Sequence, residues 1–135
     1  MMKMAQEEYA RYLLGNFNTN RDDKGIHMFR LDENVLKGAP YLDCAWFWPT
    51  STPIEIIGSH SHDFEEVIAF FGADAQNPLD LGGEIEFWMG EERFILTQSK
   101  IIFVPKNVKH CPLIIRKADR PIFHFSFGVS TKYDL

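Results

Sequence analysis

The feature that most limits the fold of this chain is a succession of short apolar segments, each ended by glycine, proline, asparagine or aspartate. The segments are rich in β-branched and aromatic residues, which favour extended strands. Turn signals so closely spaced leave no room for the helical crossovers that a parallel sheet needs. The sequence therefore predicts an all-β sandwich or small barrel, with nine strands near residues 26–31, 41–49, 54–58, 65–72, 84–90, 93–97, 100–105, 111–116 and 121–128.

A short helix is expected before the strands. Apolar residues of the segment 4–14 fall near helical spacing, and Gly15 can end the helix. The following residues, 16–24, are rich in asparagine and aspartate and are expected to form a connector. At 135 residues the chain can bury one core without disulfides, so we expect a helix and connector over 1–24 and a single β domain over 25–135.

Composition excludes several classes of protein. The 14 basic and 19 acidic side chains give a net charge of −5, which disfavours binding to nucleic acid. No apolar run is long enough to span a membrane, and Gln6, Glu7 and Glu8 interrupt the run that a secretory signal needs. We therefore expect a cytoplasmic protein with no membrane or nucleic-acid partner, in which Cys44 and Cys111 are reduced thiols.

Two segments bear on what surrounds the strands. Residues 67–71 are apolar on both alternating faces, so this strand is either covered on both sides or lies at a subunit contact, and a homodimer is expected. Residues 73–83 form the longest stretch without strand character. They are expected to be a lid over a cavity or a long hairpin connection.

Three histidines and one glutamate form a pattern suited to a metal ion. His60 and His62 are two residues apart, so in an extended strand both rings leave the same face. Glu66 follows four residues after His62, and its carboxylate can turn back toward the imidazoles. Glu65 is the rival ligand, but it lies on the opposite strand face. His110 comes 44 residues after Glu66, and closure of a barrel would bring it across.

This donor set restricts the metal and its ligand. Three neutral imidazoles and one carboxylate suit one borderline divalent ion per chain, Fe, Mn, Ni, Co or Zn, and suit magnesium or calcium badly. In an octahedral ion, four protein ligands leave two positions for water, dioxygen or a chelating molecule. Since the ion and one carboxylate carry a net positive charge, a monoanionic chelate such as a 2-oxo acid, a 2-hydroxy acid or an enolised diketone would neutralise the site.

The same residues resemble the two motifs of the cupin superfamily. The first motif, G-x5-H-x-H-x3-E-x6-G, is matched at its metal-binding positions by His60, His62 and Glu66. The second, G-x5-P-x-G-x2-H-x3-N, is matched by Pro105 and His110. The resemblance includes every ligand position of both motifs.

The resemblance covers about residues 26–127, with departures outside the ligands. Asparagine tolerates the left-handed backbone conformation better than most residues, so Asn107 can replace a glycine of the second motif. The departures are Ile54 for the first glycine, Gly72 one residue early, Ser99 and Asn107 for the glycines of the second motif, and Ile114 for its asparagine.

The resemblance implies a jelly-roll β-barrel that binds a divalent metal through His60, His62, Glu66 and His110. Cupins with this ligand set include dioxygenases, decarboxylases, isomerases, lyases and non-catalytic proteins, so the reaction stays open. We expect a metal-dependent enzyme acting on a small chelating anion, by dioxygenase-like or by non-redox lyase or isomerase chemistry. The alternative is a non-catalytic cupin that binds or senses a small metabolite or a metal.

Further residues are weaker candidates. His124 would orient a substrate or act as a base if it faced the barrel interior, and would be structural on the outer face. Glu84 and Glu86 share one strand face and are either an inward acid and base or an outward solvated pair. Cys111 follows His110 and is expected on the opposite face, as a small buried hydrophobe.

Overall fold

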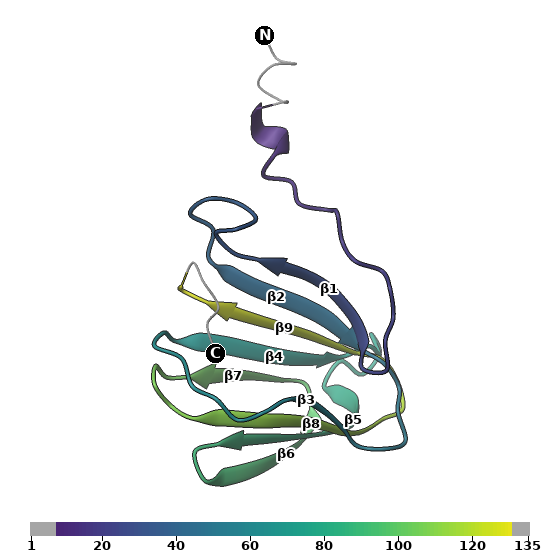
Figure 1. The fold of residues 1–135 in the computed structure, drawn as a ribbon. Coiled ribbons are helices and arrows are strands. Elements are labelled where there is room, and N and C mark those ends of the chain that lie inside the picture. Colours follow the sequence, from purple (N-terminus) through teal and green to yellow (C-terminus); the bar gives the residue numbers. More distant parts are fainter. Residues whose placement is uncertain (1–7, 131–135) are drawn as a thin grey trace.

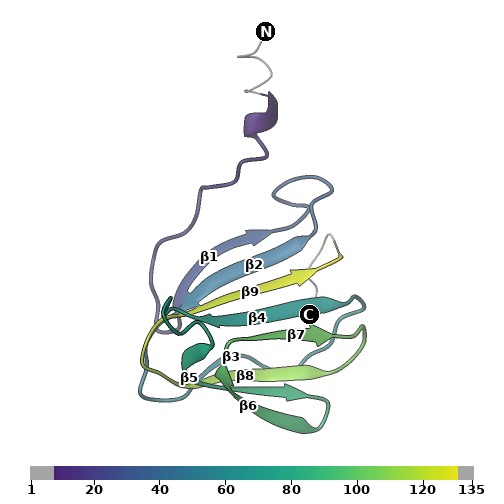
Figure 2. The same cartoon turned by 180° about the vertical axis from the view of Figure 1, so that it is seen from behind.

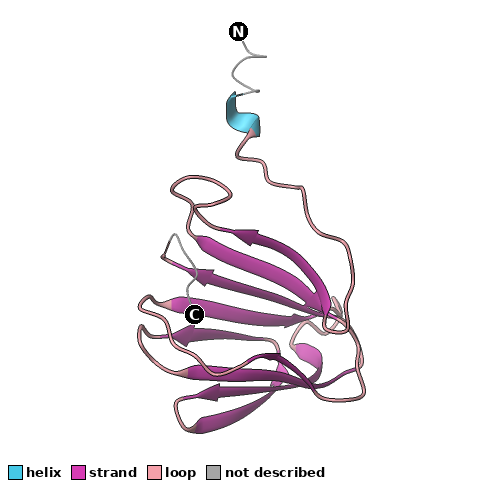
Figure 3. Cartoon of the chain, viewed as in Figure 1, coloured by secondary structure: helices cyan, strands magenta, loops and turns pink. Residues whose placement is uncertain are grey.

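The computed structural model describes residues 8–130, and this part of the chain contains nine strands and little helix (Figure 1 and Figure 3). The all-β prediction and the number of strands are confirmed. The strands are β1 (Gly25–Leu31), β2 (Tyr41–Phe47), β3 (Ile54–Ile57), β4 (Glu66–Gly72), β5 (Asp80–Met89), β6 (Glu92–Gln98), β7 (Lys100–Val104), β8 (His110–Ala118) and β9 (Ile122–Gly128).

The strands form two antiparallel sheets that face each other (Figure 2). The five-stranded sheet has the order β1-β2-β9-β4-β7, and the four-stranded sheet has the order β3-β8-β5-β6. Neighbours in each sheet are mostly distant in sequence, so pairs such as β2–β9 bring residues near 45 beside residues near 124.

The core lies between the sheets because their strands alternate apolar side chains inward. In β4, Ile68 and Phe70 are buried in the core, and in β5 Ile85 and Phe87 are equally buried. Sheet-on-sheet packing of this kind buries one face of each strand and leaves the other outside. The outer face of the five-stranded sheet keeps exposed apolar groups, including Phe103.

The prediction of a closed barrel is wrong, because no strand pair links the two sheets within residues 8–130. β1 pairs only with β2, and β3, which has four residues, pairs only with β8. Between these edges lies a cavity rather than a ladder of backbone hydrogen bonds, and a Lys24 Nζ contact of 3.5 Å to the Ile56 carbonyl crosses it. The molecule is an open two-sheet jelly roll.

Within the described residues, the expected N-terminal helix ends at residue 10 and not at residue 14. Helical backbone is described at residues 8–10 only, and the part of the prediction before residue 8 lies outside the described residues. The segment stands away from the sheets (Figure 1), with Leu13 82% exposed, and a helix without a packing surface is marginal in water. Within residues 8–130, no helix is long and apolar enough to cross a membrane.

The stretch 73–83, expected to lack strand structure, divides into two parts. Residues 73–79 connect β4 to β5, with a turn in which Asp80 N–H donates to the Asn77 carbonyl at 3.1 Å. From Asp80 onward the backbone already belongs to β5, and Gly82 takes a φ of 74°. Because the two glycines of this strand have no side chains, the alternation that predicts a strand was visible only after them, and the start of β5 was missed.

Candidate metal centre

Four side chains meet between the two sheets: His60, His62, Glu66 and His110. Each offers one ligand atom, and these atoms all lie within 4.8 Å of one another. Glu66 begins β4 of the five-stranded sheet and His110 begins β8 of the four-stranded sheet, whereas both other histidines lie on the connection from β3 to β4. The structure thus brings together the four residues that the sequence pattern selected.

Backbone hydrogen bonds hold the connection in place. His60 and His110 form an isolated antiparallel bridge, with N–O distances of 3.0 and 2.8 Å. The Asn107 N–H donates to the His62 carbonyl at 2.7 Å. Asn107 has a φ of 66°, so the asparagine does adopt the left-handed conformation for which the second cupin motif uses glycine.

Two ring orientations are fixed by carbonyl groups. Nδ1 of His60 lies 2.7 Å from the Gly58 carbonyl and Nδ1 of His110 lies 2.9 Å from the Val108 carbonyl. A carbonyl accepts only, so each Nδ1–H donates, which leaves Nε2 of each ring as the nitrogen available to an ion. Metal-binding histidines are commonly oriented in this way.

The charges around Glu66 fit a bound cation. Its Oε1 lies 3.1 Å from Nε2 of His110 and 3.6 Å from Nε2 of His62, and its side chain is 3% exposed. The contact with His110 is a hydrogen bond, and the carboxylate oxygen with the two imidazole nitrogens gathers the donor atoms that a divalent cation prefers. Burial lowers the pKa of His60, which favours the neutral ring that a metal requires. The residues present therefore fit a divalent ion.

The choice of Glu66 over Glu65 agrees with the geometry, because Glu65 is exposed and outside the cluster. The strand alternation that separated these neighbours holds at the start of β4. His27 and His124 also lie outside the cluster of possible ligands.

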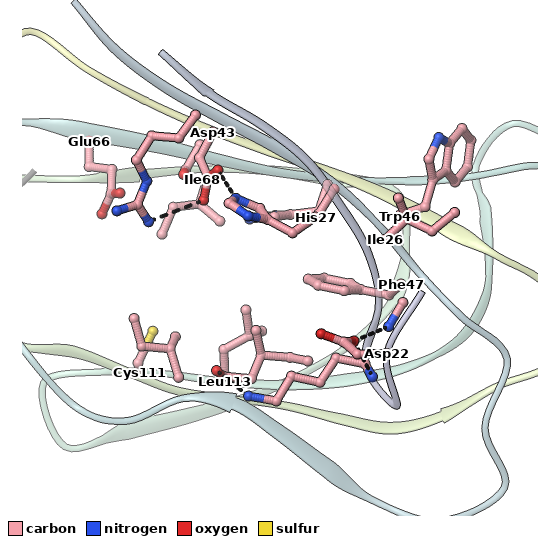
Figure 4. A pocket seen from close by; sticks show the side chains of 18 of the residues that line it. Asp22, Ile26, His27, Asp43, Trp46, Phe47, Glu66, Ile68, Cys111 and Leu113 are labelled. Atoms are coloured by element: carbon pink, nitrogen blue, oxygen red, sulfur yellow. Dashed lines mark hydrogen bonds and ion pairs between the residues drawn. The ribbon is translucent and has the colours of Figure 1, made fainter. Parts of the chain in front are cut away.

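A cavity of about 290 Å³ adjoins the cluster and includes His60 and Glu66 in its lining. Its two walls differ in chemistry. Figure 4 shows Glu66, Asp43 and His27 on one wall and Cys111 and Leu113 across the cavity. The first wall belongs to the five-stranded sheet, and the opposite wall, which also has Ile56 and Ile57, belongs to the four-stranded sheet.

His124 faces this cavity rather than the outer surface of the sheet. Its ring stacks between Phe47 and Phe70, with centroid separations of 5.1 and 5.0 Å, and its Nδ1 lies 3.1 Å from the Ala69 carbonyl. Burial lowers the pKa of His124 to about 4, so the ring is neutral at neutral pH. A role in orienting a substrate stays a prediction.

The expected alternation fails at Cys111. This residue is buried in the core and lines the cavity although it directly follows the inward His110. Its φ of 69° breaks the two-residue period of the strand, which a side-chain pattern alone does not reveal. Burial raises the pKa of its thiol to about 12, so Cys111 is a protonated hydrophobe and not a nucleophile.

Glu86 is not part of the cavity lining, and it is not a solvated side chain either. Its carboxylate accepts hydrogen bonds from Arg93 at 3.0 Å, Arg116 at 2.9 Å and the Trp88 indole at 2.8 Å. These partners, Arg93 first, lower the pKa of Glu86 to about 2. The outward placement of Glu86 is therefore structural.

Sequence reasoning missed the polar side chains of the cavity wall on β1 and β2. These are His27, Arg30, Tyr41 and Asp43. The alternation of the β2 strand carried a usable signal, because Tyr41, Asp43 and Ala45 share one face. Nothing in the sequence indicated that this face would lie opposite the metal ligands.

Comparison with known proteins gives matches in structure only. Neither a family model nor a curated protein sequence matches this chain. The oxalate decarboxylase of Lactobacillus farciminis, in a formate complex, superposes with a TM-score of 0.57 and 15% identity over 87% of this chain and 32% of that one. An oxalate oxidase in complex with glycolate gives a TM-score of 0.55 and 10% identity over 90% of this chain and 61% of that one.

A third structure shows why this likeness concerns the fold alone. Peruvianin-I, described as a cysteine peptidase from Thevetia peruviana latex, gives a TM-score of 0.60 at 8% identity over 91% of this chain and 74% of its own. At such low sequence identities a shared fold does not imply a shared reaction. The present chain spans about a third of the length of the oxalate decarboxylase that it matches.

The structure is thus a small two-sheet antiparallel jelly roll whose histidine and glutamate cluster could hold a metal ion. In fold the chain is similar to these oxalate decarboxylase and oxalate oxidase structures, which agrees with the jelly roll that the resemblance to the two cupin motifs implied.

Proposed function

We propose that this protein is a metal-dependent cupin enzyme that acts on a small, chelating, monoanionic molecule. The observation that carries the proposal is the convergence of His60, His62, Glu66 and His110, with donor atoms within 4.8 Å of one another, beside a cavity. The ion would be one of Fe, Mn, Ni, Co or Zn, since this mixed nitrogen and oxygen donor set suits them.

The size and charge of the cavity support a small anionic ligand. Its volume, about 290 Å³, lies at the low end for small-molecule sites. The charged side chains of the lining are Asp22, Lys24, Arg30, Asp43 and Glu66, which sum to one negative charge. A divalent ion reverses this to one positive charge, which a monoanionic chelate balances.

A divalent ion at this site would activate a chelated ligand as a Lewis acid or as a carrier of oxygen. The chain itself fixes the ligating rings through the Gly58 and Val108 carbonyls and supplies an apolar wall opposite the polar one. His124 is neutral and presents Nε2 as an acceptor, because its Nδ1–H donates to the Ala69 carbonyl.

Elemental analysis of protein purified without chelator or nickel affinity tests the proposal first. About one metal ion per chain is expected. Oxygen uptake with 2-oxo acids, diketones or catechols would identify dioxygenase chemistry. Turnover of the same compounds without oxygen uptake would identify lyase or isomerase chemistry. Metal-free protein that also fails to take up Fe, Mn, Ni, Co or Zn would refute the metal site.

The alternative is a non-catalytic cupin that binds or senses a small molecule or metal. Measuring whether the ligand is consumed distinguishes it from an enzyme. A binder raises its melting temperature with ligand and leaves the ligand unchanged, whereas an enzyme consumes it. Complete recovery of every stabilising ligand after long incubation with loaded protein would favour the binder.

A further inference from the structure

A second polar cluster lies in the same cavity, on β1 and β2. It consists of His27, Arg30 and Asp43. Asp43 accepts a hydrogen bond from Nε2 of His27, drawn as a dashed line in Figure 4, and its other oxygen lies 3.7 Å from Arg30. Arg30 is the register partner of Asp43 across the β1–β2 pair. None of the three belongs to the cluster of possible metal ligands.

A row of polar groups connects this cluster to the candidate metal centre. Ser126 of β9 is the register partner of Asp43 on one side and of Ile68, two residues after Glu66, on the other. Its hydroxyl is paired with that of Tyr41 at 2.6 Å. From β4 through β9 and β2 to β1 there are three strand spacings, roughly 14 Å across the sheet. The cavity therefore offers polar contacts at two separated places along one wall.

The second cluster is electrically balanced. The Arg30 guanidinium and the Asp43 carboxylate cancel, and half of each of the His27 and Arg30 side chains is exposed at this end of the cavity. A second carboxylate on the ligand would meet Asp43, and an ammonium group would meet Arg30. Neither charged group is favoured there.

The cluster offers one kind of acceptor and one kind of donor. Because Asp43 takes the Nε2–H of His27, Nδ1 is the ring nitrogen left for a ligand, and it is an acceptor in the neutral form of the ring. Arg30 contributes N–H donors beside it. A hydroxyl group both donates and accepts, so it complements this pair.

We propose that His27, Arg30 and Asp43 form a recognition subsite for hydroxyl groups, and that the ligand is a hydroxylated monocarboxylate whose carboxylate end chelates the metal. This inference rests on the proposed function, because it takes the metal centre as the anchor of the ligand. His27 and Arg30 contact the ligand, and Asp43 positions both of them.

Three six-carbon acids with the same 2-hydroxy acid head test the subsite. Gluconate carries hydroxyl groups along its tail, 2-hydroxyhexanoate has an apolar tail, and glucarate ends in a second carboxylate. Each is titrated calorimetrically into full-length protein loaded with Co(II), with the metal content measured on the same sample. We expect gluconate to bind about tenfold more tightly than either other acid, as one or two hydrogen bonds would give.

The variants His27→Gln and Arg30→Met should each reduce the preference for gluconate over 2-hydroxyhexanoate severalfold, while binding of 2-hydroxyhexanoate and the cobalt content stay unchanged. Arg21→Met is the matched control, because it removes the same charge from a residue that stacks on Trp48 and does not line the cavity. Circular dichroism checks that the strands are intact.

The outcomes separate the two proposals. Stoichiometric cobalt with equal affinity for gluconate and 2-hydroxyhexanoate, tighter binding of glucarate, or variants that keep the wild-type preference would overturn the subsite and leave the metal centre standing. Loaded protein that binds none of the three acids would overturn the subsite as well. Failure to bind cobalt would refute the proposed function and, with it, the subsite.

Discussion

Replacement of Glu66 by glutamine should change the stability of the metal-free and metal-loaded protein in different ways. The side chain is 3% exposed, so the metal-free protein buries a carboxylate beside two imidazoles. Glutamine has the same shape without the charge. Removal of a poorly solvated charge should leave the metal-free melting temperature unchanged or raise it.

The loaded protein should behave in the opposite way. Loss of the single anionic ligand should weaken metal affinity by at least about 100-fold, the upper end of what lesser changes around a metal cost. At a free metal concentration of about 1,000 times the wild-type Kd, binding stabilises the wild type by about 4.1 kcal/mol, and the variant would keep about 1.4 kcal/mol. For a domain of this size the difference corresponds to about 10 °C in Tm.

Thermal melts followed by circular dichroism, with and without buffered Mn(II) or Co(II), measure both effects. Glu65→Gln is the matched control, since it removes the same charge one residue away from an exposed position outside the cluster. If Glu65→Gln lost the metal-dependent stabilisation and Glu66→Gln kept it, the ligand assignment would be refuted.

Three further predictions concern other parts of the structure. His62→Ala and His110→Ala should each lower the bound metal sharply while the β circular dichroism persists; full metal occupancy in both would refute the site. The pKa of Glu86 is lowered from 4.5 to about 2, so its carboxylate should contribute stability above pH 4.5 that is lost as the pH falls toward 2. The loss should be only about 1 kcal/mol, because the arginine partners are partly exposed. Glu86→Gln should remove this part of the dependence of the unfolding free energy on pH. The exposed apolar face around Phe103, 57% exposed, should support the expected homodimer, so light scattering should show a dimer for the wild type and a monomer for Phe103→Glu; a wild-type monomer would end that expectation.

The strands and the four clustered residues could be predicted from the sequence because both depend on residue types and spacings within short segments. The spacing of His60, His62 and Glu66 reflects one short connection, and the turn at Asn107 brings His110 to the same place. The side chains of that turn matter less than its backbone conformation, which asparagine can adopt. This part of the site was therefore accessible from residue types and separations.

Other features depend on the arrangement of the sheets, which local patterns do not carry. Whether β1 and β3 pair or leave a cavity is decided by the packing of distant strands, and sequence reasoning chose the closed barrel. The inward position of Cys111 follows from one left-handed residue. The burial of Glu86 follows from two arginines on other strands that cover it. Each is a tertiary effect on a locally ordinary residue.

The cavity is assembled from two separate stretches of the chain. More than half of its lining comes from residues 22–47, whereas all four clustered side chains come from residues 60–110. Substitutions in the first stretch can reshape what the cavity accepts without disturbing the ligating atoms. Under the proposed function, ligand selectivity and metal binding would therefore depend on different stretches of the chain, and substitutions confined to the cavity-lining side chains of residues 22–47 would alter the first and preserve the second.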